Sequence, residues 1–400
     1  MRLAIVKDGE EHCPEGGEIV TMKNAMKIVI ALDSFKGTLT SREACVIVAE
    51  SITRRLAAAE LVIKPMADGG EGTARALIEA AGGTWISCLV MGPFPEMEVE
   101  AGFAWFPRES TALVEMAAAS GLELVPPGKL DPLRATTYGT GQLIRAANKY
   151  GARRVLLAIG GSATVDAGTG AALALGWQFL DGSGEPVPLG GAGLECVDRI
   201  VRPSGCELAP VEILCDVDNP LLGELGAARI YGPQKGATPE MVEHLERGLS
   251  HLAGLIETQL GRDIRTIPGA GAAGGLGAGA VAFMNGRTVS GIKTVMSLSG
   301  LKEELAAADW VITGEGSFDC QSLMGKVVSG VVEMARETST RVAVIAGQVT
   351  VSADEYRAHG IETALSCRGD DMPLSYALEN SRDLLSEAAG RFVCKCLAET

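Results

Sequence analysis

Aromatic residues, histidines and long apolar runs are all scarce in this chain of 400 residues. Phe, Trp and Tyr make up 4% of it, and there are four histidines. No apolar run is long enough to span a membrane, and residues 1–25 lack the basic-then-apolar pattern of a secretory signal. A net charge of −15 argues against binding to nucleic acid or anionic membranes. We therefore expect a cytoplasmic protein with neither nucleic acid nor membrane as a partner; the composition leaves its oligomeric state open.

Several catalytic signatures are missing as well. No Cys-x-x-Cys or His-x-x-x-His pair occurs, which argues against zinc sites, and the ten cysteines suit reduced thiols better than a disulfide framework. No Gly-x-Ser-x-Gly elbow is present. A P-loop is excluded because Val327 follows Gly325-Lys326 where a hydroxyl residue would be needed. What remains in excess is glycine, with 51 residues and no collagen-like period.

Short apolar runs alternate with glycine-rich loops and amphipathic helices along most of the chain. Lys27–Leu32 is a predicted buried strand, and Thr40 with Glu43 forms a capping box that predicts the next helix. Between Gly92 and Arg134 the alternation instead indicates an antiparallel element. The pattern predicts an α/β protein of two domains with largely parallel sheets, whose ligands collect at the carboxyl ends of the strands.

Carboxylates, lysines and glycine loops fall at these predicted strand ends, and phosphoryl transfer needs these groups around the moving phosphate. Lys36, Asp68, Asp216 and Asp319 are the predicted catalytic residues, with Asp68 and Asp216 also as candidate Mg²⁺ ligands. The predicted substrate- or phosphate-binding residues are Ser34, Gly69, Gly70, Glu71, Gly160, Gly161, Ser162, Asn219, Lys235, Gly271, Gly274, Glu315 and Lys326.

Structural explanations compete with several of these assignments. Asp319 could be only a helix N-cap, Asn219 only part of a turn, and Lys326 only a solvated helix charge. The segment from Gly269 to Gly274 fits a dinucleotide fingerprint, but it follows a poor strand and no acidic residue occurs before Glu303. It is better explained as a loop that approaches a phosphate, or as close helix packing without a ligand.

In combination, these segments resemble the bacterial-type glycerate kinase family, in family order and over nearly the whole chain from Met26. The matching segments run from Asp33 to Gly37, Pro65 to Thr73, Gly160 to Thr164, Cys215 to Pro220, Gly232 to Ala237, Gly269 to Gly275 and Thr313 to Gly316. The block from Pro65 to Thr73 is the most specific of them.

The resemblance implies phosphorylation of D-glycerate with ATP and Mg²⁺, with 2-phosphoglycerate favoured over 3-phosphoglycerate as the product. It also implies a discontinuous flavodoxin-like, Rossmann-like three-layer domain, here residues 26–90 and 288–400. A second α/β domain, residues 91–287, would be inserted into it, with the substrates in the cleft between the two. Residues 1–25 are expected to be a poorly ordered N-terminal extension.

Three positions depart from the family pattern. Leu32 stands where the family usually has proline, Val165 replaces an asparagine, and Ser317 replaces an arginine. Loss of a guanidinium near a carboxylate or phosphate would change substrate binding. Two alternatives therefore stay open, namely a kinase of another small hydroxy acid and a non-catalytic sensor that keeps the same cleft.

Overall fold

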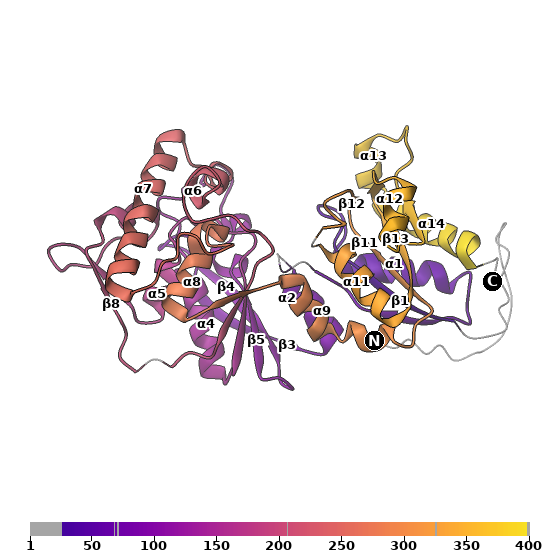
Figure 1. The fold of residues 1–400 in the computed structure, drawn as a ribbon, viewed down its shortest axis with the longest axis horizontal. Coiled ribbons are helices and arrows are strands. Elements are labelled where there is room, and N and C mark those ends of the chain that lie inside the picture. Colours follow the sequence, from indigo (N-terminus) through magenta and orange to yellow (C-terminus); the bar gives the residue numbers. More distant parts are fainter. Residues whose placement is uncertain (1–25, 68, 70–71, 206, 325, 398–400) are drawn as a thin grey trace. The chain divides into compact units, whose positions relative to one another are not determined.

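The computed structural model describes residues 26–67, 69, 72–205, 207–324 and 326–397 (Figure 1). The expected N-terminal extension, residues 1–25, lies outside this range. The described residues form two compact units. Unit 1 consists of those within 1–68, 79–81 and 295–400, and unit 2 of those within 69–78 and 82–294. That the chain folds as two domains with the predicted boundaries stays a prediction.

Unit 1 is built on a five-stranded sheet of the order β15-β13-β11-β1-β2, in which all neighbouring strands are parallel. Its strands are β1 (Lys27–Leu32), β2 (Glu60–Ile63), β11 (Trp310–Gly314), β13 (Arg341–Ala346) and β15 (Thr363–Ser366). In order of sequence this is the 2-1-3-4-5 arrangement of flavodoxin-like sheets. The direction of the strand order reverses between β1 and β11, where such sheets bind their ligands.

Helices cover both faces of this sheet. The predicted capping box between Thr40 and Glu43 is present at the start of α1. Helices α1 and α14 pack together on one face, where Ile28 and Ile30 of β1 join their core, while α11 packs on β11 and β13. Besides these, unit 1 contains two short strands and further helices. The elements are α1 (Ser41–Thr53), α10 (Leu301–Leu305), β12 (Ser317–Phe318), α11 (Val327–Thr338), β14 (Gln348–Val349), α12 (Ala353–Ala358), α13 (Leu374–Glu379) and α14 (Ser381–Phe392).

Unit 2 contains a six-stranded mixed sheet of the order β10-β9-β6-β5-β4-β3. Strands β10, β9, β6 and β5 are parallel to one another, whereas β4 is antiparallel to both β5 and β3. The strands are β3 (Thr84–Met91), β4 (Glu98–Phe106), β5 (Thr111–Glu115), β6 (Arg154–Ala158), β9 (Val211–Leu214) and β10 (Arg287–Val289). The predicted antiparallel element is thus confirmed, although it begins at Thr84 rather than near Gly92.

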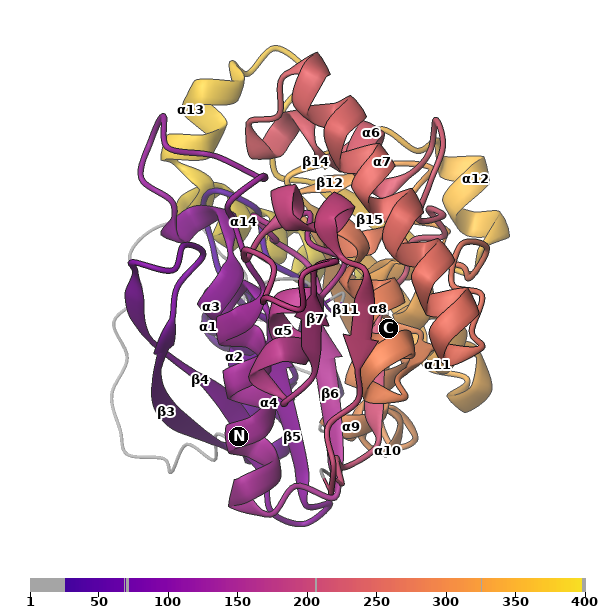
Figure 2. The same ribbon diagram turned by 90° about the vertical axis from the view of Figure 1, so that its left-hand side faces the viewer.

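The remaining elements of unit 2 surround this sheet, with α4 and α5 packed side by side (Figure 2). They are α3 (Ala117–Ser120), α4 (Tyr138–Tyr150), α5 (Thr169–Ala174), β7 (Gln178–Leu180), β8 (Arg199–Val201), α6 (Ala227–Tyr231), α7 (Pro239–Leu255) and α8 (Leu276–Met284). Helices α2 (Thr73–Ala81) and α9 (Gly291–Ser299) run across the borders of the two units. The mixed α/β fold with parallel sheets is confirmed.

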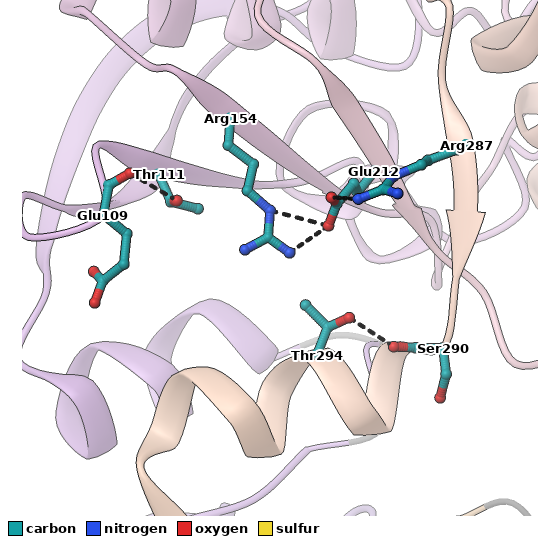
Figure 3. A network of polar contacts seen from close by, with 7 residues as sticks. All are labelled: Glu109, Thr111, Arg154, Glu212, Arg287, Ser290 and Thr294. Atoms are coloured by element: carbon teal, nitrogen blue, oxygen red, sulfur yellow. Dashed lines mark hydrogen bonds and ion pairs between the residues drawn. The ribbon is translucent and has the colours of Figure 1, made fainter.

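An ionic cluster ties three strands of the unit 2 sheet together near their amino ends (Figure 3). Glu212 of β9 is buried and pairs with Arg154 of β6 and Arg287 of β10. Its Oε2 lies 3.0 Å from Arg154 Nε, and its Oε1 lies 2.5 Å from Arg287 Nη2. Burial alone would raise the pKa of the Glu212 carboxyl, but hydrogen bonds from the two guanidinium groups outweigh it and lower that pKa. Because the predicted site residues follow the opposite ends of these strands, the cluster serves the sheet and not the chemistry.

In the part of the chain that the structure describes, no helix combines the length and the apolar character needed to cross a membrane.

Candidate active site

A cavity of about 380 Å³ lies at the carboxyl edge of the unit 1 sheet. It is lined by residues that directly follow four parallel strands: Asp33, Ser34 and Lys36 after β1, Glu315 and Gly316 after β11, Gly347 and Gln348 after β13, and Cys367 and Arg368 after β15. Five predicted site residues, Ser34, Lys36, Glu315, Asp319 and Lys326, are therefore brought together here from distant parts of the sequence.

Glycines allow the strand-end loops to approach one another closely. A Cβ added to Gly314 would lie 1.8 Å from the carbonyl oxygen of Ile345, and one on Gly347 would lie 2.4 Å from the carbonyl oxygen of Gly316. Neither contact is possible for a real side chain, so only glycine fits at these two positions. These glycines thus allow the two lining segments after β11 and β13 to approach each other closely.

The loop after β1 presents a cation to the cavity. Phe35 is buried and pairs through its backbone with Leu39, and Gly37 has a φ of 80°, which closes a tight turn. Lys36 at the tip of this turn is exposed and lines the cavity, while Asp33 at its base accepts a hydrogen bond of 2.6 Å from the Ser34 N–H. The turn therefore brings both a cationic and an acidic residue to the lining of the cavity.

The segment after β11 supplies two more charges. Asp319 Oδ1 accepts hydrogen bonds from the N–H groups of Gln321 at 2.8 Å and Ser322 at 3.2 Å, so part of this carboxylate fixes its own turn. Lys326 immediately precedes α11 and lines the cavity. A cation at the amino end of a helix is unfavourable next to the helix dipole unless an anion offsets it. The position of Lys326 thus favours an anionic ligand in the cavity.

Two parts of this cavity were not among the predicted site residues. Arg368 follows the last strand, where its Nε donates to the Met372 carbonyl oxygen at 2.7 Å and its Nη1 to Gln348 Oε1 at 3.2 Å. These contacts fix a guanidinium group at the rim. One wall comes from α13 and the start of α14, through Leu374, Leu378 and other residues. Arg368 could have been found from its place after a predicted strand, whereas a helix of six residues leaves no recognisable period.

Unit 2 gathers a second group of predicted residues around a buried lysine. Lys235 is 1% exposed, and its Nζ donates to Ser162 Oγ at 2.6 Å and to the Thr164 carbonyl oxygen at 2.8 Å. Burial lowers the pKa of this ammonium group to about 7. Lys235 therefore holds the loop after β6, which includes Gly160 and Gly161, from inside.

Asp166 anchors the same loop and is fully buried. Its carboxylate accepts hydrogen bonds from Thr137 N and Oγ1, both at 2.8 Å, and from the N–H groups of Gly168 at 3.0 Å and Gly170 at 3.3 Å. Burial raises the pKa of this carboxyl in spite of those hydrogen bonds. With this many internal donors, Asp166 acts as a structural anchor for the loop.

Asp216 follows β9 and caps the start of α9. Its Oδ1 accepts from Ser290 Oγ at 2.9 Å and from Gly291 N at 3.2 Å, and its Oδ2 accepts from Ile292 N at 3.3 Å. Gly69 lies beside this group, since a Cβ added there would be 3.2 Å from the Gly291 Cα. Gly69 thus lies next to a residue whose N–H the Asp216 carboxylate accepts.

The other predicted residues of unit 2 are engaged in packing. Asn219 donates from Nδ2 to the Leu225 carbonyl oxygen at 2.9 Å, and its Oδ1 accepts from the Tyr231 hydroxyl at 2.7 Å. The Gly271 N–H donates to the Asn219 carbonyl oxygen at 3.0 Å. A Cβ on Gly274 would lie 1.9 Å from the Thr164 carbonyl oxygen. Of the two explanations for this glycine segment, these contacts support close packing.

Three predicted residues, Asp68, Gly70 and Glu71, lie outside the described residues. Among those described, no three His, Cys, Asp or Glu side chains cluster as a metal site. Mg²⁺ in kinases is usually held by one or two carboxylates together with substrate phosphates. The oxygen donors of Asp33, Glu315 and Asp319 around the cavity, and of Asp216 in unit 2, fit that chemistry.

The departures from the family pattern lie in different environments. Ser317 is exposed and lines the unit 1 cavity, so an arginine there would add a fourth cation to it. Val165 is fully buried in the core of unit 2, and Leu32 is fully buried at the end of β1. Only the departure at Ser317 changes the lining of the cavity.

Comparison with known proteins agrees with this arrangement. Residues 28–397 match the model of the glycerate kinase family. The chain is 42% identical to a glycerate kinase of Halalkalibacterium halodurans over 90% of its length and 96% of the relative's. It is 40% identical to the glycerate 2-kinase of Escherichia coli, over 91% and 96% of the two chains. A crystal structure described as that of a glycerate kinase 2 from Salmonella typhimurium LT2 superposes with a TM-score of 0.82, at 39% identity, over 94% of this chain and 99% of that one. The chain therefore belongs to the glycerate kinase family.

Proposed function

We propose that this protein transfers the γ-phosphoryl group of ATP to D-glycerate in the presence of Mg²⁺ and forms 2-phosphoglycerate. Membership of a kinase family implies a nucleotide as the phosphoryl donor. The choice of the 2-position rests on the relative from Escherichia coli that is named glycerate 2-kinase. The observation that carries the proposal is the cavity in which Lys36, Asp319 and Lys326 meet, at the point where the strand order reverses.

Phosphoryl transfer through a loose transition state asks the protein mainly to position the reactants and to stabilise charge. The bond between the γ-phosphorus and the bridging oxygen of ADP breaks as a bond to the glycerate oxygen forms. Lys36 and Lys326 would stabilise the negative charge on the moving phosphoryl group. Bound Mg²⁺ would neutralise part of the phosphate charge, and its proposed ligands are Asp68 and Asp216.

The hydroxyl proton of glycerate must also leave during transfer. Asp68, Asp216 and Asp319 are the proposed acceptors, and the roles of base and metal ligand stay undivided among them. A loose transition state requires little base strength, so a carboxylate suffices as the acceptor. Lys235 has no place in this step because its ammonium group is buried and engaged with Ser162 and Thr164.

The identity of the product distinguishes this proposal from a glycerate 3-kinase and from a protein without glycerate kinase activity. Purified protein incubated with Mg·ATP and D-glycerate should give the phosphorus NMR resonance of 2-phosphoglycerate, and EDTA should abolish it. Formation of 3-phosphoglycerate would contradict the proposed regiochemistry but would uphold the proposed glycerate kinase activity. Absence of any phosphoglycerate would contradict the proposal itself.

One observation favours a second candidate, a kinase of another small hydroxy acid. Ser317 lines the cavity at the position where the family usually has arginine, so one cation that could pair with a carboxylate or phosphate is missing. A panel of 2- and 3-hydroxy acids assayed with Mg·ATP separates the two candidates. Turnover of another acid at a higher kcat/KM than that of D-glycerate would favour the second.

A further inference from the structure

The unit 1 cavity has two chemically different walls. The strand-end wall carries three cations and three carboxylates, which are Lys36, Lys326, Arg368, Asp33, Glu315 and Asp319. The opposite wall comes from α13 and the start of α14 and carries Leu374, Ala377, Leu378 and Leu384. The spacing of Leu374, Ala377 and Leu378 places them on one helical face. A ligand that fills this cavity must therefore be charged at one end and apolar at the other.

The apolar wall is accessible to a ligand. Leu374 is 57% exposed and Leu378 is 47% exposed, although both belong to a helix that packs against α14. Large apolar side chains that remain exposed along one face of a concave site commonly mark a place where a ligand covers them. Tyr376 on the same helix is also exposed but does not line the cavity, so it marks the outer face.

D-glycerate does not match these walls. It is a three-carbon acid with a carboxylate, two hydroxyl groups and almost no apolar surface, and it would leave the leucines uncovered. A cavity of about 380 Å³ falls within the roughly 300–1,000 Å³ of sites that hold drug-sized ligands. A purine nucleoside has a flat apolar face and carries its phosphates at the opposite end, so its shape and polarity match both walls.

We infer that the unit 1 cavity binds the nucleoside of the phosphoryl donor, with the base against Leu374, Ala377 and Leu378 and the phosphates toward Lys36 and Lys326. This rests on the proposed kinase function and assigns the base-binding residues of that same site. The place at the reversal of the strand order agrees with it, because flavodoxin-like sheets bind nucleotides there. The acid is then held elsewhere than on the α13 wall.

The test uses the full-length protein and two substitutions on one helix. Leu378→Asp places a charge against the base, while Tyr376→Ala changes a side chain of similar exposure outside the cavity. Binding of the non-hydrolysable analogue adenylyl imidodiphosphate is measured by calorimetry with Mg²⁺. We expect Leu378→Asp to weaken it about tenfold or more, since a leucine-sized apolar contact is lost, and Tyr376→Ala to leave it within about twofold. Equal effects of the two substitutions would overturn the inference.

Inhibition by fragments of the nucleotide separates the two ends of the cavity. Leu378→Asp should weaken inhibition by adenosine and leave inhibition by inorganic tripolyphosphate unchanged, and Lys36→Met should do the reverse. The KM for D-glycerate should stay unchanged in Leu378→Asp. If that substitution raised the KM for D-glycerate and not that for ATP, the cavity would be the acid site and the inference would be wrong.

These measurements keep the inference separate from the proposed function. Analogue binding that depends on Leu378 in a protein that fails to phosphorylate D-glycerate would overturn the function and uphold the nucleotide site. Phosphorylation of D-glycerate with an ATP KM indifferent to Leu378→Asp would do the opposite. Far-ultraviolet circular dichroism of each variant shows that it is folded; if Leu378→Asp does not fold, Ala377→Trp, which fills the cavity, gives the same comparison.

Discussion

Lys235 should make the stability of the protein depend on pH in the neutral to alkaline range. Its ammonium group is buried, with a pKa of about 7 in the folded chain against 10.5 for an ordinary lysine. Between these two values the unfolded chain binds the additional proton, so the free energy of unfolding rises with pH. The stabilisation is complete above the unfolded pKa and is lost progressively as the pH falls toward 7.

The size of the effect follows from the same two pKa values. A single group contributes at most about 1.4 kcal/mol per pH unit, and integration from pH 7 to pH 9 gives about 2 kcal/mol. Lys235→Met keeps the length of the side chain and removes the titration. It also leaves Ser162 Oγ and the Thr164 carbonyl oxygen without their donor, which costs about 1–3 kcal/mol at every pH.

Urea unfolding at pH 7, 8 and 9 measures both effects. We expect the free energy of unfolding of the wild type to gain about 2 kcal/mol more than that of Lys235→Met over this range. Ser162→Ala is the matched control, because it removes one hydrogen bond and keeps the titrating amine. Parallel pH profiles for the wild type and Lys235→Met would show that Lys235 titrates at its ordinary pKa, and would refute the argument from burial.

Lys36→Met should lower kcat for phosphoryl transfer about a hundredfold, because Lys36 lines the cavity and would stabilise the moving phosphoryl group. Lys149→Met, at an exposed position of unit 2, is the control and should leave kcat unchanged. Equal losses of kcat in the two variants would show that Lys36 does not take part in phosphoryl transfer. Glu212→Gln should lower the free energy of unfolding by about 2 kcal/mol, a value reduced because the two arginines are partly exposed to solvent. The KM for ATP and the KM for D-glycerate should not change. A large change in either KM would contradict a purely structural role for the cluster. Gly314→Ala should destabilise the protein by about 3 kcal/mol in the same urea assay. The control Gly182→Ala should cost less than about 0.5 kcal/mol, because no neighbouring atom lies within 4 Å of a Cβ added there. Equal values for the two substitutions would contradict the close approach of β11 and β13.

Much of the fold could be predicted because it depends on local signals. Strand β1 has the predicted bounds, Lys27–Leu32, because a short uninterrupted apolar run is typical of a strand that is buried on both faces. The predicted cap at Thr40 is present, because its side chain satisfies an N–H group of its own helix. The antiparallel element was predicted to begin too late because polar and apolar residues do not alternate clearly in the sequence of β3.

The candidate site could be predicted only in part. Loops at strand ends gave Lys36, Glu315 and Asp319, because topology places all such loops at one edge. The burial of Lys235 could not be predicted, since lysine is almost always exposed and only tertiary contacts reveal the exception. Nor could the role of α13 be predicted, because Leu378 lines the cavity together with residues after β1 and β11 that are distant in the sequence.

The central claim is tested most directly by the rate of ADP formation when purified protein and Mg·ATP are incubated with and without D-glycerate. The account predicts release of ADP that depends on D-glycerate and saturates with it. ADP formation that is absent, or that is unchanged by D-glycerate while the protein is folded and Mg²⁺ is present, would contradict it.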